Sequence, residues 1–119
     1  KNPKLVVIEN LAFMARNTTA LTQLAALNYF VRSMLFKRNI PFVLVAPTTL
    51  KKFVCGKGNA DKNMVMMEIY KQYNHSALDD NEADAYALAA LGLAVLGKPI
   101  NKLNKPQLET VALIKKQIC

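Results

Sequence analysis

Four acidic side chains stand within six positions of this chain, at Asp79, Asp80, Glu82 and Asp84. If the segment is helical, Asp80 and Asp84 are four residues apart and project from the same face, and Asn81 can converge with Asp84. Two carboxylates on one face repel each other, and a divalent cation removes that repulsion. Mg²⁺ or Mn²⁺ prefers such oxygen ligands, so this stretch predicts a metal-dependent site.

The same stretch also has a purely structural interpretation. Asp79 followed three residues later by Glu82 fits a capping box, and acidic residues in a first helical turn complement the helix dipole. One or two acids would satisfy that role, and four exceed it.

The composition limits the classes of protein that the chain can represent. Its 119 residues suffice for one domain, and 52% apolar residues exclude a disordered chain. The net charge of +8 indicates a polyanionic partner, most simply nucleic acid. The longest apolar run, Ala83–Leu96, is too short to span a bilayer. Cys55 and Cys119 lack metal-ligand spacing, which predicts reduced thiols and a cytoplasmic protein, and His75 is expected in a surface loop.

Two apolar runs predict parallel strands. Lys4–Ile8 is a continuous β-branched run, expected to be buried on both faces, and Phe42–Val45 is the second strand. A predicted helix, Ala20–Lys37, lies between them, which gives a β-α-β unit with a right-handed crossover. Glu9 directly follows the first run. The carboxyl end of a central strand is where open α/β sheets place their active sites, so Glu9 is a candidate catalytic residue.

The rest of the chain is predicted to be helical, within a single domain over residues 1–119. The helix Ala20–Lys37 has an apolar stripe broader than one sheet contact needs, which indicates either a helix-mediated homodimer or a large internal core. Gly and Pro residues delimit the later helices. These are expected at Leu50–Val54, Lys62–Tyr73, Asn81–Leu96 and Pro106–Ile118.

Basic residues cluster beside a glycine-containing loop. Lys51, Lys52, Lys57 and Lys62 fall within twelve residues, and the loop Gly56–Lys62 can present backbone N–H groups to phosphates. A solvated basic surface is the alternative. A second candidate for nucleic-acid contact is the loop Leu11–Asn17, in which an exposed Phe13 beside Arg16 and Asn17 would stack on bases or wedge between them. The spacing alone favours Phe13 as a core residue instead.

Several of these segments together resemble the RuvC-type Holliday junction resolvases, in particular phage-like members, which have a ribonuclease-H-like fold. The match runs in order over about residues 4–92. Val6–Glu9 resembles the strand that carries a catalytic Glu, and Asp84–Ala89 resembles the helix that carries the last catalytic Asp. The segments Phe13–Asn17, Ala46–Lys52 and Gly56–Lys62 are similar to the family's DNA-contacting segments.

The resemblance implies a structure-selective endonuclease that resolves four-way DNA junctions in recombination and repair. Glu9, Asp80 and Asp84 would hold two Mg²⁺ ions, about 3.5–4 Å apart, for which Mn²⁺ substitutes. Phe13, Arg16, Asn17, Lys51, Lys52, Lys57 and Lys62 would contact branched DNA, and a homodimer would cut two opposed strands.

Two features depart from the family pattern. The family begins with an antiparallel meander whose first strand bears an Asp ligand, and residues 1–5 supply none. Either that part precedes Lys1, which we favour, or the chain is catalytically incomplete. The second departure is Asn81, which stands where the family often has an acid or His, so that Asp80 would take that role. The alternatives are a ribonuclease-H-like nuclease acting on flaps or RNA, and a non-catalytic DNA-binding module.

Overall fold

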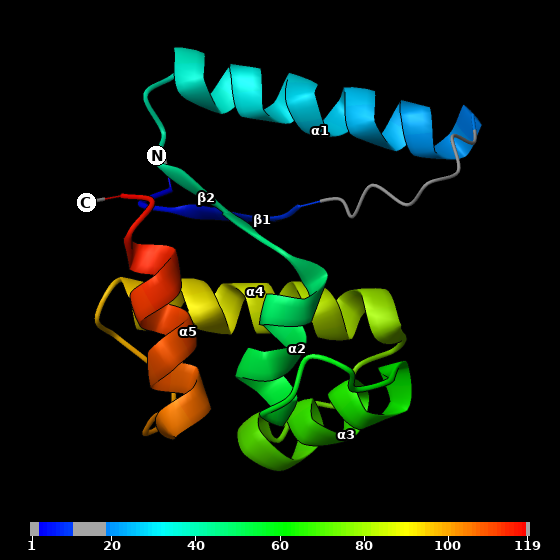
Figure 1. Cartoon of the computed structure of the whole chain (residues 1–119), viewed down its shortest axis with the longest axis vertical. Helices are drawn as coiled ribbons and strands as arrows, with labels where there is room; N and C mark the ends of the chain where they lie inside the picture. Colours follow the sequence, from blue (N-terminus) through cyan, green and yellow to red (C-terminus); the bar gives the residue numbers. More distant parts are fainter. Residues whose placement is uncertain (1–2, 11–18, 119) are drawn as a thin grey trace.

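In a computed structural model, which describes residues 3–10 and 19–118, two parallel strands form the centre of the fold (Figure 1). β1 (Val6–Glu9) pairs with β2 (Phe42–Val45), with Glu9 opposite Val45. The predicted β-α-β unit is therefore confirmed. Because the strands are parallel, their carboxyl ends lie at the same edge of the sheet, above the amino-terminal half of helix α4.

The helices lie on both sides of this sheet. α1 crosses one face, whereas α4 crosses the other and the remaining helices pack around α4 (Figure 1). This is the predicted α/β architecture of parallel strands flanked by helices. The helices are α1 (Thr19–Lys37), α2 (Pro47–Cys55), α3 (Lys62–Tyr73), α4 (Asp80–Val95) and α5 (Lys105–Lys115). No helix within the described ranges combines the length and the hydrophobicity needed to cross a membrane.

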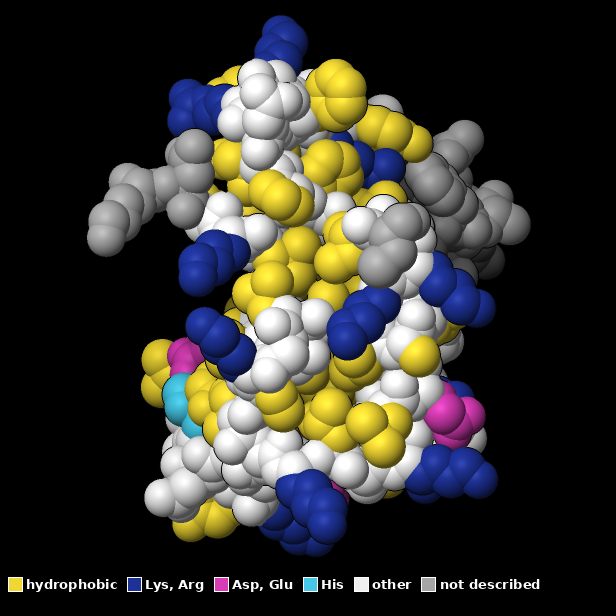
Figure 2. Space-filling model, turned by 90° about the vertical axis from the view of Figure 1, so that its left-hand side faces the viewer, with side chains coloured by type: hydrophobic (Ala, Val, Ile, Leu, Met, Phe, Trp, Pro, Cys, Tyr) yellow, Lys and Arg dark blue, Asp and Glu magenta, His cyan; other side chains and the backbone are white. Residues whose placement is uncertain are grey.

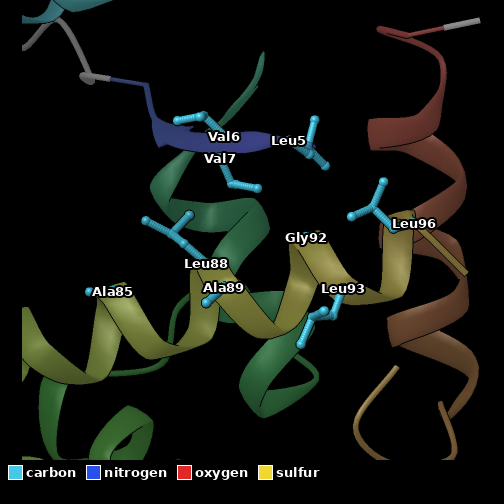
Figure 3. A pocket seen from close by; sticks show the side chains of 9 residues that line it. All are labelled: Leu5, Val6, Val7, Ala85, Leu88, Ala89, Gly92, Leu93 and Leu96. Carbon is cyan, nitrogen blue, oxygen red and sulfur yellow. The ribbon is translucent and has the colours of Figure 1, made fainter. Parts of the chain in front are cut away.

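The small residues of α4 allow a strand to lie directly on it. Ala83, Ala87 and Ala90 are buried in the core. At Gly92 an added Cβ would lie 2.9 Å from Val7 Cγ2, so only glycine permits this approach of β1 without a shift. An apolar groove remains between β1 and α4, lined by side chains from both elements (Figure 3).

Helix ends follow the caps that the sequence predicts. The Asp61 side chain accepts a hydrogen bond from the Met64 N–H at the start of α3, and Gly56 ends α2 with φ 83°. A further cap was not predicted: Asn104 and Gln107 form a capping box at the start of α5.

The predicted burial of the first strand is wrong. The ordered strand starts at Val6 rather than at Lys4, and all four residues of β1 are only half-buried. The reason is that α1 packs sparsely on its face of the sheet, and many of its large apolar side chains remain exposed. Smaller differences are that α2 begins earlier than Leu50 and that α5 ends at Lys115 rather than Ile118.

Candidate active site

The carboxyl end of β1 and the first turns of α4 meet at a small pocket of about 150 Å³. Glu9 reaches it from β1, and Asp80 and Asp84 reach it from α4. Lys51 of α2 and Lys62 of α3 line the same pocket, together with Pro47 and Val65. The pocket is smaller than the roughly 300–1,000 Å³ of a typical small-molecule site, and its lining includes three carboxylates and two lysines.

Burial and like charge act together on the carboxylates of this pocket. The pKa of Glu9 is raised above its usual value, first by burial and then by the negative charge of Asp84. The pKa of Asp84 is also raised, first by burial and then by the charge of Asp80. The ionised forms are therefore disfavoured by the fold, and a cation placed between these groups would be stabilised.

Two lysines offset part of this repulsion. Lys62 Nζ lies 3.4 Å from Asp80 Oδ2, and the charges of Lys51 and Lys62 both lower the pKa of Asp84. The Lys62 side chain is 80% exposed, so it remains available to a ligand outside the pocket. The pocket thus has carboxylates at its centre and ammonium groups at its rim.

The other two acids of the cluster have structural roles. The Asp79 side chain accepts a hydrogen bond from the Glu82 N–H at the start of α4. Glu82 Oε1 lies 3.0 Å from His75 Nε2, and the His75 ring stacks on Tyr86 at 4.4 Å between centroids. The capping interpretation is therefore right for Asp79. His75, expected in a surface loop, is half-buried by these contacts.

The remaining candidate residues lie in other places. Lys52 points toward α5, where its Nζ is 3.8 Å from Glu109 Oε2, and Lys57 is exposed in the loop after α2. Phe13, Arg16 and Asn17 lie outside the described residues. At the end of the molecule where the strands begin, Lys and Arg side chains are scattered among apolar ones (Figure 2).

The donor set of the pocket fits a hard divalent cation in part. The oxygen ligands come from two different elements, Glu9 from β1 and Asp84 from α4, which is a suitable arrangement for Mg²⁺. Within the part of the chain that the structure describes, however, no group of three or more acidic, His or Cys side chains is gathered closely enough to hold a metal ion. Asp80 is instead drawn to Lys62.

Sequence reasoning missed the walls of this pocket. Pro47, which directly follows β2, and Val65 of α3 both line it. Pro47 carries a usable signal, because it stands at the carboxyl end of the second parallel strand and thus at the same sheet edge as Glu9. Val65 carries none, since it reads as an ordinary core residue of α3.

Comparison with known proteins shows the family to which this sequence is related. The family model "Crossover junction endodeoxyribonuclease RuvC" matches residues 1–94. Curated proteins of that name are 36% identical over 91 residues in Chlamydia muridarum and 33% identical over 93 residues in Chlamydia trachomatis serovar L2. These matches cover 73% and 75% of this chain, and 53% and 54% of the relatives. The chain thus spans about half the length of the curated relatives it matches.

A solved structure gives the same result for the fold. The structure of Thermus thermophilus RuvC superposes with a TM-score of 0.58 at 25% identity, covering 81% of this chain and 60% of that one. The predicted ribonuclease-H-like fold is confirmed. The family match extends over the pocket, from Glu9 through Asp84, and the chain belongs to the RuvC family of crossover junction endodeoxyribonucleases.

Proposed function

We propose that this protein acts as a structure-selective DNA endonuclease that resolves four-way junctions by metal-dependent phosphodiester hydrolysis. Family membership supports the reaction class. The observation that carries the proposal for this chain is the pocket in which Glu9 and Asp84, from different elements, repel each other beside Lys51 and Lys62.

In this proposal Glu9, Asp84 and Asp80 hold the cation, and lysines hold the DNA backbone. The RuvC family is metal-dependent, and oxygen-only donors favour Mg²⁺, with Mn²⁺ as a substitute. The bound ion would supply an activated water and stabilise the leaving oxygen. Lys51 and Lys62, at the rim, would orient the scissile phosphate, while Lys57 would bind the backbone beyond the pocket.

A non-catalytic DNA-binding module is the second candidate. The observation that favours it is the lack of a compact three-ligand group among the described residues. A further Asp ligand from a preceding strand stays a prediction. A nuclease acting on flaps or RNA would share the pocket chemistry, and the symmetry of cutting distinguishes it, because a resolvase nicks two opposed strands.

We expect Asp84→Asn and Glu9→Gln to reduce Mg²⁺-dependent cleavage of a synthetic four-way junction by about 10²-fold or more, because each removes a charged metal ligand. Junction binding in EDTA should be retained. The matched control is Glu109→Gln, which neutralises an acid on α5 that faces Lys52. Cleavage by Asp84→Asn at the parent's rate would remove this residue from the site.

We expect Asp84→Asn to raise Tm by a few degrees in EDTA at pH 7. Because the pKa of Asp84 is raised in the folded state, its ionised form opposes folding above that pKa. The difference in Tm should narrow as the pH falls through the raised pKa, and vanish below the unfolded value of about 3.9. Thermal unfolding followed by circular dichroism measures it.

Measuring the Tm of the parent and of Asp84→Asn with added Mg²⁺ tests the cation site directly. The parent should gain Tm with added Mg²⁺, since an ion bound to the folded state alone stabilises it, and Asp84→Asn should gain less. If Asp84→Asn melts at or below the parent's Tm at pH 7 in EDTA, burial and the charge of Asp80 do not disfavour the ionised form of Asp84 as the geometry indicates.

We expect Lys57→Ala and Lys51→Ala to weaken junction binding and to lower the slope of log K against log[salt] by about one unit each, because each lysine would displace one counterion. Fluorescence anisotropy at several salt concentrations measures the slope. Lys115→Ala, at the far end of α5, is the control that removes the same charge. A slope equal to the parent's for both Lys57→Ala and Lys51→Ala would mean that neither lysine contacts the DNA backbone.

We also propose that the chain forms a homodimer through the apolar face of α1. Leu27 and Phe30 are 59% and 63% exposed, and other large apolar side chains of this helix are exposed beside them. A monomeric soluble protein seldom leaves so much contiguous apolar surface uncovered. The exposed set comprises Leu24, Leu27, Tyr29, Phe30, Val31, Met34 and Phe36.

We expect Phe30→Glu to shift the chain from dimer to monomer in sedimentation velocity experiments, because it places a charge inside the buried interface. Tyr70→Glu on α3 is the control, since Tyr70 is 57% exposed and lies outside α1. A parent chain that sediments as a monomer at all concentrations tested, or a Phe30→Glu variant that remains dimeric, would contradict this interface.

A further inference from the structure

Two polar side chains of α1 contact the end of β1, directly behind Glu9. Asn28 Nδ2 donates to the Glu9 carbonyl oxygen at 3.3 Å, and an Arg32 terminal nitrogen donates to Asn10 Oδ1 at 3.0 Å. Asn28 and Arg32 are four residues apart, so they project from the same face of the helix. These contacts join α1 to the strand end from which the Glu9 side chain leaves.

Successive side chains of β1 point to opposite faces of the sheet, so the contacts with α1 lie on the face away from the pocket. Val7 faces α4, where it meets Gly92, whereas Ile8 meets the α1 residues Leu24 and Leu27. With a period of two, Glu9 projects on the side of Val7 and Asn10 on the side of Ile8. Arg32 and Asn28 therefore hold the back of the strand, on the face opposite to the pocket.

This polar contact is costly in its surroundings. Among the described residues, the buried atoms Arg32 Nε and Asn28 Oδ1 lack hydrogen-bond partners. The Arg32 guanidinium also lies over the Tyr29 ring, 4.7 Å from its centroid. Burying polar atoms without partners reduces stability compared with an apolar contact. Stability alone therefore does not account for an Arg and an Asn at this point.

The strand end needs such support. β1 has four residues, is half-buried, and within the described residues pairs with β2 alone. Asn10 follows the strand: its N–H donates to the Val45 carbonyl oxygen at 2.7 Å, and its side chain accepts from Arg32. Of these two contacts between described residues, the Val45 hydrogen bond alone would remain without Arg32.

We propose that Arg32 and Asn28 are positioning residues for Glu9. By fixing the end of β1, they keep the Glu9 carboxylate within reach of the Asp84 carboxylate, although these two carboxylates repel each other. This inference rests on the proposed function, in which the two carboxylates share a cation. Neither Arg32 nor Asn28 touches the cation or the DNA. Their effect is to hold the Glu9 and Asp84 carboxylates together before the ion binds. This lowers the free-energy cost of ordering the two carboxylates on binding.

Mn²⁺ binding to the DNA-free chain tests the proposal without relying on cleavage. Isothermal titration calorimetry should give a Kd for Arg32→Gln about 10-fold weaker than the parent's, as for other residues that orient a metal ligand. Arg32→Lys, which keeps one donor for Asn10, should recover part of the affinity. Arg38→Gln is the matched control, because it removes an exposed Arg just after the same helix and should bind Mn²⁺ as the parent does.

A double-substitution cycle separates positioning from general destabilisation. If Arg32 acts through Glu9, adding Arg32→Gln to Glu9→Gln should weaken Mn²⁺ binding no further. Additive losses would instead overturn the proposal. Asn10→Ala removes the acceptor of the same hydrogen bond and should weaken Mn²⁺ binding to the same extent. It therefore tests the proposal even if Arg32→Gln does not fold.

The outcomes for this inference and for the proposed function are distinct. A parent chain that binds no Mn²⁺ would overturn the cation site, and this inference with it. A parent that binds Mn²⁺ while Arg32→Gln and Asn10→Ala bind it equally well would overturn the positioning role alone.

Discussion

The half-burial of Glu9 and Asp84 in one pocket, with negative charge beside each, is the constraint on which the chemistry of this pocket depends. Neither group is fully solvated, and each carries a raised pKa because burial and neighbouring negative charge act in the same direction. A flexible chain would separate two such groups. The fold prevents this by carrying them on two elements, a strand and a helix, whose relative position is set by packing elsewhere.

That packing is made possible by small side chains. α4 presents alanines to the core, and at Gly92 it presents no side chain at all to Val7. Because β1 can approach α4 this closely, the carboxyl end of the strand lies over the first turns of the helix, where Asp84 is. A large residue at position 92 would push the strand away, and Glu9 would move with it. The chemistry of the pocket therefore depends on a contact two helical turns away.

The sequence predicts the elements of this arrangement well, because their signals are local. Apolar runs define β1 and β2, Asp61 and Asp79 mark helix starts, and Gly56 marks a helix end. The sequence pattern places Glu9 at the carboxyl edge of the sheet, but its nearness to Asp84 followed only from the family resemblance, because Asp84 lies on a helix. The roles assigned to these two residues and to Asp80 stay predictions.

What the sequence could not predict are the contacts between side chains far apart in the chain. Arg32 and Asn10 are 22 residues apart, and nothing local in either segment indicates that they meet. The half-buried state of β1 was missed for a related reason. The apolar stripe of α1 predicts burial, but it does not say whether the sheet or a second molecule covers it.

The division of labour within the acidic cluster explains why it has four members. Asp79 caps α4, and Glu82 holds His75 against Tyr86, so these two fix the helix start. Asp80 and Asp84, in the first two turns of α4, both line the pocket. A DNA phosphate approaching this pocket brings further negative charge to carboxylates that already repel.

The compensating charge must therefore lie at the pocket itself, and a net charge of +8 spread over the surface does not supply it. Lys51 and Lys62 lower the pKa of Asp84, but the pKa still lies above its usual value, so the lysines alone do not neutralise the site. Positive charge between the carboxylates would complete the balance. In the proposed site a divalent cation would supply it in a volume that the pocket can hold, whereas an additional lysine side chain would displace the carboxylates.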